Sequence, residues 1–173
     1  MMYTTTEQLA GMVRDGVLDL SHTAVQDLTP VRWLTNLQVL VLSHTDVVDV
    51  SALDTLRSLR VLLLNHTKVA DVSALSELSS LRVLGLNATP VANVDPLCRL
   101  SRLKMLDLTD TRVADVRPLG SLTGLKELYL GNTGVMDVSA LGELFELEVL
   151  ELDSTPAADV SPLAGLTRLM LLR

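Results

Sequence analysis

The sequence predicts an α/β solenoid, with a parallel sheet along one side of its coils and short helical or 3₁₀ segments along the other. First, a 22-residue unit repeats seven times between residues 15 and 168 without insertion or deletion. Second, each unit contains a strand-like leucine pattern followed by a helix-like one. Third, the same threonine recurs in every unit: Thr23, Thr45, Thr67, Thr89, Thr111, Thr133 and Thr155. A fixed period of this length indicates stacked repeats that each contact only their neighbours.

Residues 59–80 illustrate the unit, with Leu59 as repeat position 1. Leu62 and Leu64, at positions 4 and 6, have the two-residue spacing of a strand with both side chains facing inward. Val72, Leu75 and Leu78, at positions 14, 17 and 20, have the spacing of one face of a short helix or 3₁₀ segment. The strands of neighbouring coils should therefore stack in parallel.

The turns contain recurring polar residues. The threonine at position 9 should close the turn after the strand by bonding its hydroxyl to nearby backbone. Position 15, mostly serine or threonine, is predicted to be the N-cap of the helical return. Proline often follows, as at Pro96, where its missing N–H is tolerated. Aspartate at position 13, as at Asp71, should be favoured by the helix dipole.

We predict a single domain over residues 1–173, because the repeats leave no room for a linker. Residues 5–14 should form a capping helix, with Thr4 and Glu7 at the spacing of a capping box. Seven repeats follow over 15–168, and residues 169–173 begin an eighth. The apolar end at 169–172 is compatible with a fragment of a longer protein or with self-association.

Composition narrows the function classes. The net charge of −7 argues against nucleic acid, which requires a basic surface. No apolar run is long enough to cross a membrane, and the first residues lack the features of a signal peptide. Cys98 is the only cysteine, so an intrachain disulfide is impossible and a reducing, cytoplasmic compartment is expected.

Leu59, Leu62, Leu64, Thr67 and Val69 match the leucine-rich repeat pattern L-x-x-L-x-L-x-x-N/C-x-L. The repeat length and the short Asp-Val-Ser-Pro-Leu return resemble those of regulatory subunits of type-1 protein phosphatase and of bacterial internalins. One departure is consistent, because threonine replaces the asparagine of the family in every copy. The resemblance, which covers residues 15–173, implies a curved, non-catalytic solenoid that binds proteins on its concave sheet.

Function should lie where the repeated columns vary. Side chains at positions 3 and 5 are predicted to point outward from the sheet, forming an apolar patch over repeats two to four and an acidic surface beyond it. The candidate partner-binding residues are Val39, Val41, Val61, Leu63, Val83, Met105, Asp107, Glu127, Tyr129 and Glu151. A contiguous apolar surface with a charged rim is typical of binding sites, although the strand propensity of valine is an alternative explanation.

Other residues suggest no catalytic or metal chemistry. His22, His44 and His66 share position 8 and should stack along one edge, where neighbouring imidazolium charges would repel. Such a column suits ordinary turn residues or a pH-sensitive edge better than a converging metal site. Trp33 and Phe145 are expected to pack on the convex side, and Cys98 has no histidine nearby in the repeat frame. No nucleophilic pair or phosphate-binding loop is present, so neither enzymatic activity nor a cofactor is expected.

These patterns predict a non-catalytic protein-interaction module or scaffold. The partner should be a protein or peptide with apolar and basic side chains, with no role for nucleic acid or membrane. Three alternatives remain open. They are a regulatory subunit of an enzyme such as a phosphatase, an internalin-like adhesin fragment, and an architectural segment of a larger protein.

Overall fold

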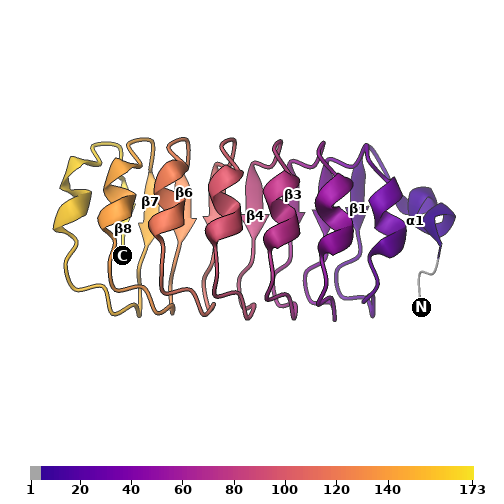
Figure 1. Cartoon of the computed structure of the whole chain (residues 1–173), viewed down its shortest axis with the longest axis horizontal. Helices are drawn as coiled ribbons and strands as arrows, with labels where there is room; N and C mark the ends of the chain where they lie inside the picture. The colour runs from indigo at the N-terminus through magenta and orange to yellow at the C-terminus, as the bar shows by residue number, and fades with distance from the viewer. Residues whose placement is uncertain (1–4) are drawn as a thin grey trace.

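The computed structural model describes residues 5–173 and has the predicted solenoid architecture. One layer is a parallel sheet and the other is a row of 3₁₀ helices (Figure 1). Within these residues, a single α-helix, α1 (Thr6–Met12), precedes the first coil. The eight strands are β1 (Val17–Asp19), β2 (Val39–Val41), β3 (Val61–Leu63), β4 (Val83–Gly85), β5 (Met105–Asp107), β6 (Glu127–Tyr129), β7 (Val149–Glu151) and β8 (Leu171–Leu172). The seven 3₁₀ helices are η1 (Thr29–Trp33), η2 (Ser51–Thr55), η3 (Ser73–Glu77), η4 (Asp95–Arg99), η5 (Arg117–Ser121), η6 (Ser139–Glu143) and η7 (Ser161–Gly165).

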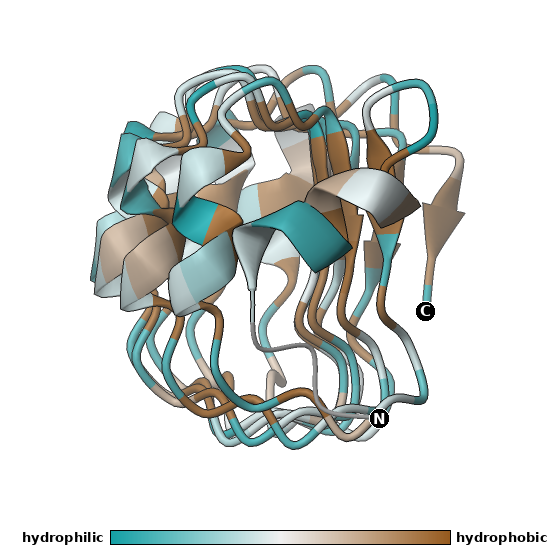
Figure 2. Cartoon of the chain, turned by 90° about the vertical axis from the view of Figure 1, so that its right-hand side faces the viewer, coloured by the Kyte–Doolittle hydropathy of each residue, from teal (hydrophilic) through white to brown (hydrophobic). Residues whose placement is uncertain are grey.

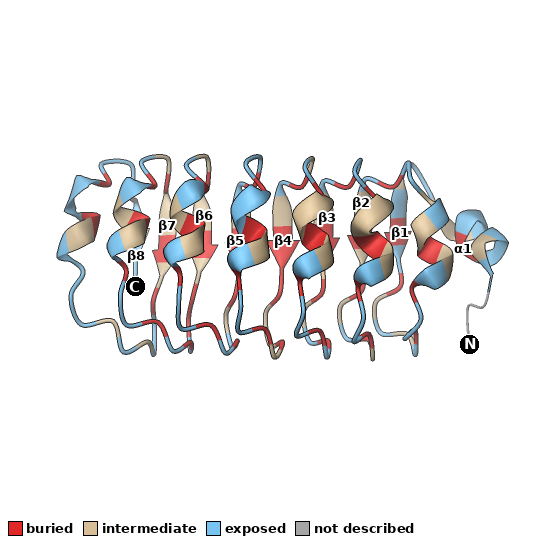
Figure 3. Cartoon of the chain, in the orientation of Figure 1, coloured by how far each residue is buried: buried red, intermediate tan, exposed pale blue. Residues whose placement is uncertain are grey.

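The strands lie in chain order, and each pairs with its neighbour at an offset of one repeat. Leu62 of β3, for example, lies between Leu40 of β2 and Leu84 of β4. These central leucines are fully buried between the sheet and the 3₁₀ layer. Figure 2 shows apolar residues, and Figure 3 buried residues, recurring at the same places in successive coils. The same register places residues at each repeat position in a straight column.

The threonine at position 9 closes each coil as predicted. Its hydroxyl donates a hydrogen bond to the carbonyl three residues earlier, over 2.6–2.7 Å in all seven repeats. This carbonyl lies where the chain leaves the sheet and needs a donor. Thr67, bonded to the Leu64 carbonyl, is only 6% exposed.

The prediction that position 15 supplies the N-cap of each return is wrong. The 3₁₀ helices begin at position 15, and no side chain of the residue before it caps them. The side chain at position 13 acts instead, accepting a hydrogen bond from the backbone N–H at position 15. Asp71 accepts in this way from Ser73 over 2.9 Å, and Asn93 accepts from Asp95 over 2.8 Å. The aspartate column therefore makes local turns of the Asx type.

At the N-terminal end, α1 covers the first coil through the buried side chain of Leu9. The helix is shorter than the expected span of 5–14 because Val13 already has an extended backbone. The N-cap is Thr5, whose hydroxyl accepts from the N–H of Gln8. The predicted cap Thr4 lies outside the described residues. Between residues 5 and 173, the structure contains no helix long and apolar enough to span a bilayer.

Candidate functional site

The side chains at positions 3 and 5 form one continuous outer face on the sheet. Val39, Val61 and Val83 are adjacent in one column, and Val41, Leu63 and Gly85 are adjacent in the next. The four valines and Leu63 are half-buried, while the leucines between them point into the core. The register therefore places all ten candidate binding residues on this face, which no other element among residues 5–173 covers. Whether the face binds a partner stays a prediction.

The apolar column at position 5 is interrupted at Gly85, which has no side chain to present on the outer face. A Cβ atom at this glycine would lie 2.6 Å from the Asn65 side-chain oxygen and 3.1 Å from a methyl carbon of Leu63. Asn65 also accepts a hydrogen bond from the N–H of Asn87 over 3.0 Å. Position 7 therefore borders the outer face with polar side chains, a contribution that the sequence analysis missed. Its alternation with positions 3 and 5 was the available signal.

The acidic part of the outer face centres on Tyr129. Its hydroxyl donates to a Glu127 carboxylate oxygen over 2.9 Å, and Asp107 and Glu151 lie on the neighbouring strands. Burial, the bond to Glu127 and the surrounding carboxylates all raise the pKa of Tyr129. Among the described residues, none of these three carboxylates forms an ion pair. Among residues 5–173, this part of the face therefore presents carboxylates that are not held in ion pairs.

One edge of the outer face has an unusual backbone. Every repeat places position 8 in the left-handed region, with φ between 53° and 59°, where histidine, asparagine and aspartate are tolerated better than most residues. His22, His44 and His66 stack there as predicted, with ring centroids 4.5 and 4.3 Å apart. Desolvation and the neighbouring histidines lower the pKa of His44.

The opposite edge is cationic, and the sequence analysis did not identify it. Position 2 is occupied in successive repeats by Gln38, Arg60, Arg82, Lys104 and Lys126. The column could have been found by reading position 2 as was done for positions 3 and 5. The net charge of −7 gives no indication of this cationic column.

Trp33 and Phe145 do not pack as predicted. Trp33 is 70% exposed and Phe145 is 55% exposed. Trp33 is the last residue of η1, and the guanidinium of Arg32 lies 5.6 Å from its ring centroid. The 3₁₀ coils bury only one face, so these side chains, at positions 19 and 21, remain on the solvent side.

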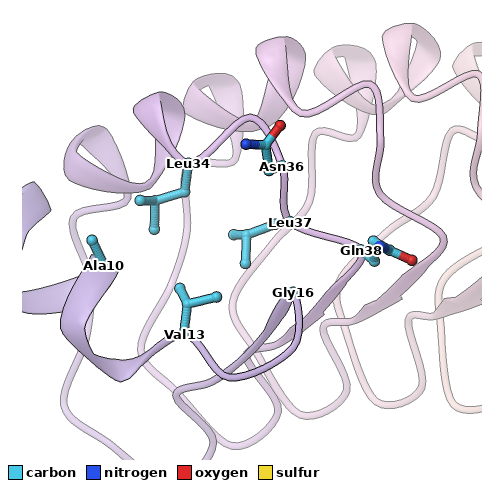
Figure 4. A pocket seen from close by; sticks show the side chains of 7 residues that line it. All are labelled: Ala10, Val13, Gly16, Leu34, Asn36, Leu37 and Gln38. Carbon is cyan, nitrogen blue, oxygen red and sulfur yellow. The ribbon is translucent and has the colours of Figure 1, made fainter.

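Two further features among the described residues are an apolar hollow and an exposed cysteine. An apolar hollow lies between α1 and the first repeats, lined by Ala10, Val13, Gly16, Leu34, Asn36, Leu37 and Gln38 (Figure 4). It contains no acid, base or nucleophile. Cys98 is exposed, and residues 5–173 contain no cluster of three histidine, cysteine or carboxylate side chains arranged to hold a metal ion.

The family model described as leucine-rich repeats (two copies) matches residues 101–143. Among solved structures, internalin C2 from Listeria monocytogenes is 35% identical to this chain, with a TM-score of 0.89. The match covers 91% of this chain and 70% of that one. The chain belongs to the leucine-rich repeat family. No curated protein matches the sequence.

Two further leucine-rich repeat structures share the fold. Another internalin from Listeria monocytogenes is 23% identical, with a TM-score of 0.57 and coverage of 98% of this chain and 69% of that one. A leucine-rich repeat protein from Leptospira interrogans is 24% identical, with a TM-score of 0.82 and coverage of 89% and 42%. At these identities the likeness supports the fold alone. None of the three is described as a phosphatase subunit, so that hypothesis stays a prediction.

Proposed function

We propose that this leucine-rich repeat chain is a non-catalytic interaction module that binds a protein partner on its outer face. One observation carries the proposal. The in-register strands combine the variable positions into a single uncovered surface that is apolar over β2–β4 and acidic over β5–β7. Leucine-rich repeat proteins generally act in protein–protein interaction, and contiguous apolar surface beside charge is typical of such sites.

The two parts of the face favour a partner with matching chemistry. Val39, Val61 and Leu63 offer apolar contacts in neighbouring strands, without a polar group between them on that face. Glu127 and Glu151, beside Tyr129, offer carboxylates for lysine or arginine side chains. Electrostatic complementarity of this kind mainly sets orientation and association rate. The partner is therefore a segment with apolar side chains at one end and basic ones at the other.

The test combines two changes in the apolar part, Val61→Lys and Leu63→Glu. Both side chains are half-buried on the outer face, so the double variant should fold and show an almost unchanged circular-dichroism melt. Partners captured from native lysate, identified by mass spectrometry, should disappear from its eluate. The introduced charges would be desolvated without a counter-charge, which commonly costs several kcal/mol at an interface.

A matched control makes the same types of change elsewhere. Val48 and Met136 are 58% and 69% exposed, and both lie outside the outer face. The variant Val48→Lys with Met136→Glu should retain every partner. If the Val61→Lys, Leu63→Glu protein captures the same proteins as the wild type, the apolar part is not the binding surface.

A second candidate function, an internalin-like adhesin, is favoured by the 35% identity to internalin C2. An adhesin would bind its partner outside the cell, whereas a cytoplasmic module would bind its partner inside the cell. Fractionation of the native cells with an antibody against this chain would separate the two. Recovery from the cell surface or medium supports the adhesin, and recovery with cytoplasmic markers supports the intracellular module.

A further inference from the structure

Three cations occupy consecutive coils along one edge of the sheet, and we refer to Arg60, Arg82 and Lys104 as the cationic edge. They share repeat position 2, immediately before the strands. A backbone ladder holds them in line: the Arg82 N–H donates to the Arg60 carbonyl, and the Lys104 N–H donates to the Arg82 carbonyl, each over 2.8 Å. Neighbouring coils are therefore separated by about one strand spacing, ~4.8 Å.

The cationic edge lacks the carboxylate partners that cations nearby have. Lys126, next in the same column, pairs with Glu148 at 2.5 Å, and Arg57 pairs with Glu77 at 2.8 Å. By contrast, Lys104 reaches only the Gly124 carbonyl, over 2.9 Å. The side chains of Arg60 and Arg82 form no ion pair or hydrogen bond with residues 5–173. Unpaired cations on consecutive coils repel one another, and a bound anion would relieve that repulsion.

A polar hollow adjoins the cationic edge. Asn36, Gln38, Ser58, Arg60 and Ser80 line it. No hydrogen bond within the described chain engages the side-chain amides of Asn36 and Gln38 or the hydroxyls of Ser58 and Ser80. The hollow therefore presents neutral donors beside an unpaired guanidinium, a combination that suits carboxylate oxygens. The hollow is not lined by any of the acidic residues of the outer face.

We propose that the cationic edge and this hollow form a second interaction surface, which binds an acidic protein segment. The unpaired charges extend over only three coils, since the column is neutralised beyond them at Lys126. That length matches a short run of carboxylates better than a nucleic acid, whose binding draws on many phosphate contacts. No aromatic residue lines the hollow for base stacking, and the chain carries a net charge of −7. The surface lies beyond the proposed outer-face site and has the opposite charge.

The test measures binding of fluorescein-labelled hexaglutamate to the whole chain by fluorescence anisotropy at an ionic strength of ~0.1 M, where the Debye length is ~10 Å. The variant Arg60→Glu with Arg82→Glu should weaken binding at least ~10-fold, the effect of losing about 1.4 kcal/mol. The control Arg99→Glu with Arg112→Glu changes the net charge equally at exposed residues away from the edge. It should remain within about twofold of the wild type, because screening limits charges farther away than the Debye length.

Each other outcome overturns the proposal. Equal weakening by both double variants would mean that only net charge matters, and absence of wild-type binding would remove the surface altogether. Tighter binding of a six-nucleotide oligothymidine would indicate a nucleic-acid site instead. Tyr129→Ala, on the outer face, should leave the hexaglutamate affinity unchanged. Failure of this proposal is therefore visible separately from failure of the outer-face proposal.

Discussion

One hydroxyl per coil closes the turn that follows each strand. The family pattern places asparagine at position 9, and this chain has threonine there in every repeat. The substitution works because a hydroxyl can donate locally to the carbonyl three residues earlier. In the five central repeats this threonine is buried, so its hydrogen bond has little competition from water. The threonine column is structural for this reason.

Thr67→Val should destabilise the protein by about 1–3 kcal/mol, because the isosteric methyl leaves the buried Leu64 carbonyl without the donor it now has at 2.7 Å. Thr67→Ser retains the hydroxyl and should cost clearly less. Urea unfolding of both variants, followed by circular dichroism, measures the difference. A Thr67→Val protein as stable as the serine variant would show that the hydrogen bond contributes little.

At the residue scale, the sequence predicted the threonine bond but assigned the cap to the wrong side chain. An Asp-Val-Ser segment offers two short oxygens near the same backbone N–H groups. Which one accepts depends on local backbone angles, and a 3₁₀ start at position 15 places Asp71 within reach of the Ser73 N–H. Hydrogen-bonding residue types were therefore readable from the sequence, whereas the donor–acceptor pairing needed the coordinates.

Among the elements, the turn containing position 8 has the same left-handed backbone in every repeat but carries different side chains. All seven repeats adopt positive φ there, although the residue is histidine in three and alanine, aspartate, asparagine or serine in the others. The sequence could place the histidines in one column but could not reveal this backbone, because no single residue type marks it. Stacking of the three imidazoles follows from the register. We expect a pH response from His44, because desolvation and its two neighbours disfavour its protonated form and lower its pKa.

Lowering the pH from about 7.5 to about 5 should reduce the melting temperature through the histidine column. The pKa of His44 in the folded protein lies below its ordinary value of 6.5, because desolvation and the charges of His66 and His22 disfavour its protonated form. Its contribution to stability is thus fully present above that ordinary value and is lost as the pH falls through the lowered pKa. Asp46 and Lys68 also border this turn, but they pair with each other at 2.6 Å.

His44→Asn is the matched variant for this effect, since asparagine tolerates positive φ and does not titrate. Melting curves across the same pH range should show a weaker dependence in the variant. The aspartates at position 13 act in a separate window, because hydrogen bonds lower the pKa of groups such as Asp71 below the ordinary value of 3.8. Their stabilisation is lost only on further acidification. Identical slopes between pH 7.5 and 5 would exclude His44 as the source.

For the whole molecule, periodicity was sufficient to predict the architecture. An uninterrupted 22-residue repeat constrains strand order, register and the columns shared by neighbouring coils, and Leu40, Leu62 and Leu84 lie where the pattern requires. The repeat constrains side chains outside its leucine positions much less. Trp33 is exposed despite its size, and the cationic edge is invisible in the net charge. Surface features such as these were identified only when the residues at each repeat position were compared in the folded chain.

A stack of repeats in which each contacts only its neighbours should respond locally to a change at one end. Leu9 is fully buried beneath α1, the element that covers the first coil. Leu9→Ala removes buried methyl groups, at a cost of about 2–5 kcal/mol, and should loosen α1, β1 and β2 more than β6 and β7. Hydrogen–deuterium exchange resolved by mass spectrometry should therefore show protection falling toward the N-terminal coils.

Leu106→Ala, at the centre of β5, is the control, and its effect should spread toward both ends. Uniform loss of protection in the Leu9→Ala protein would instead mean that the stack unfolds as one cooperative unit.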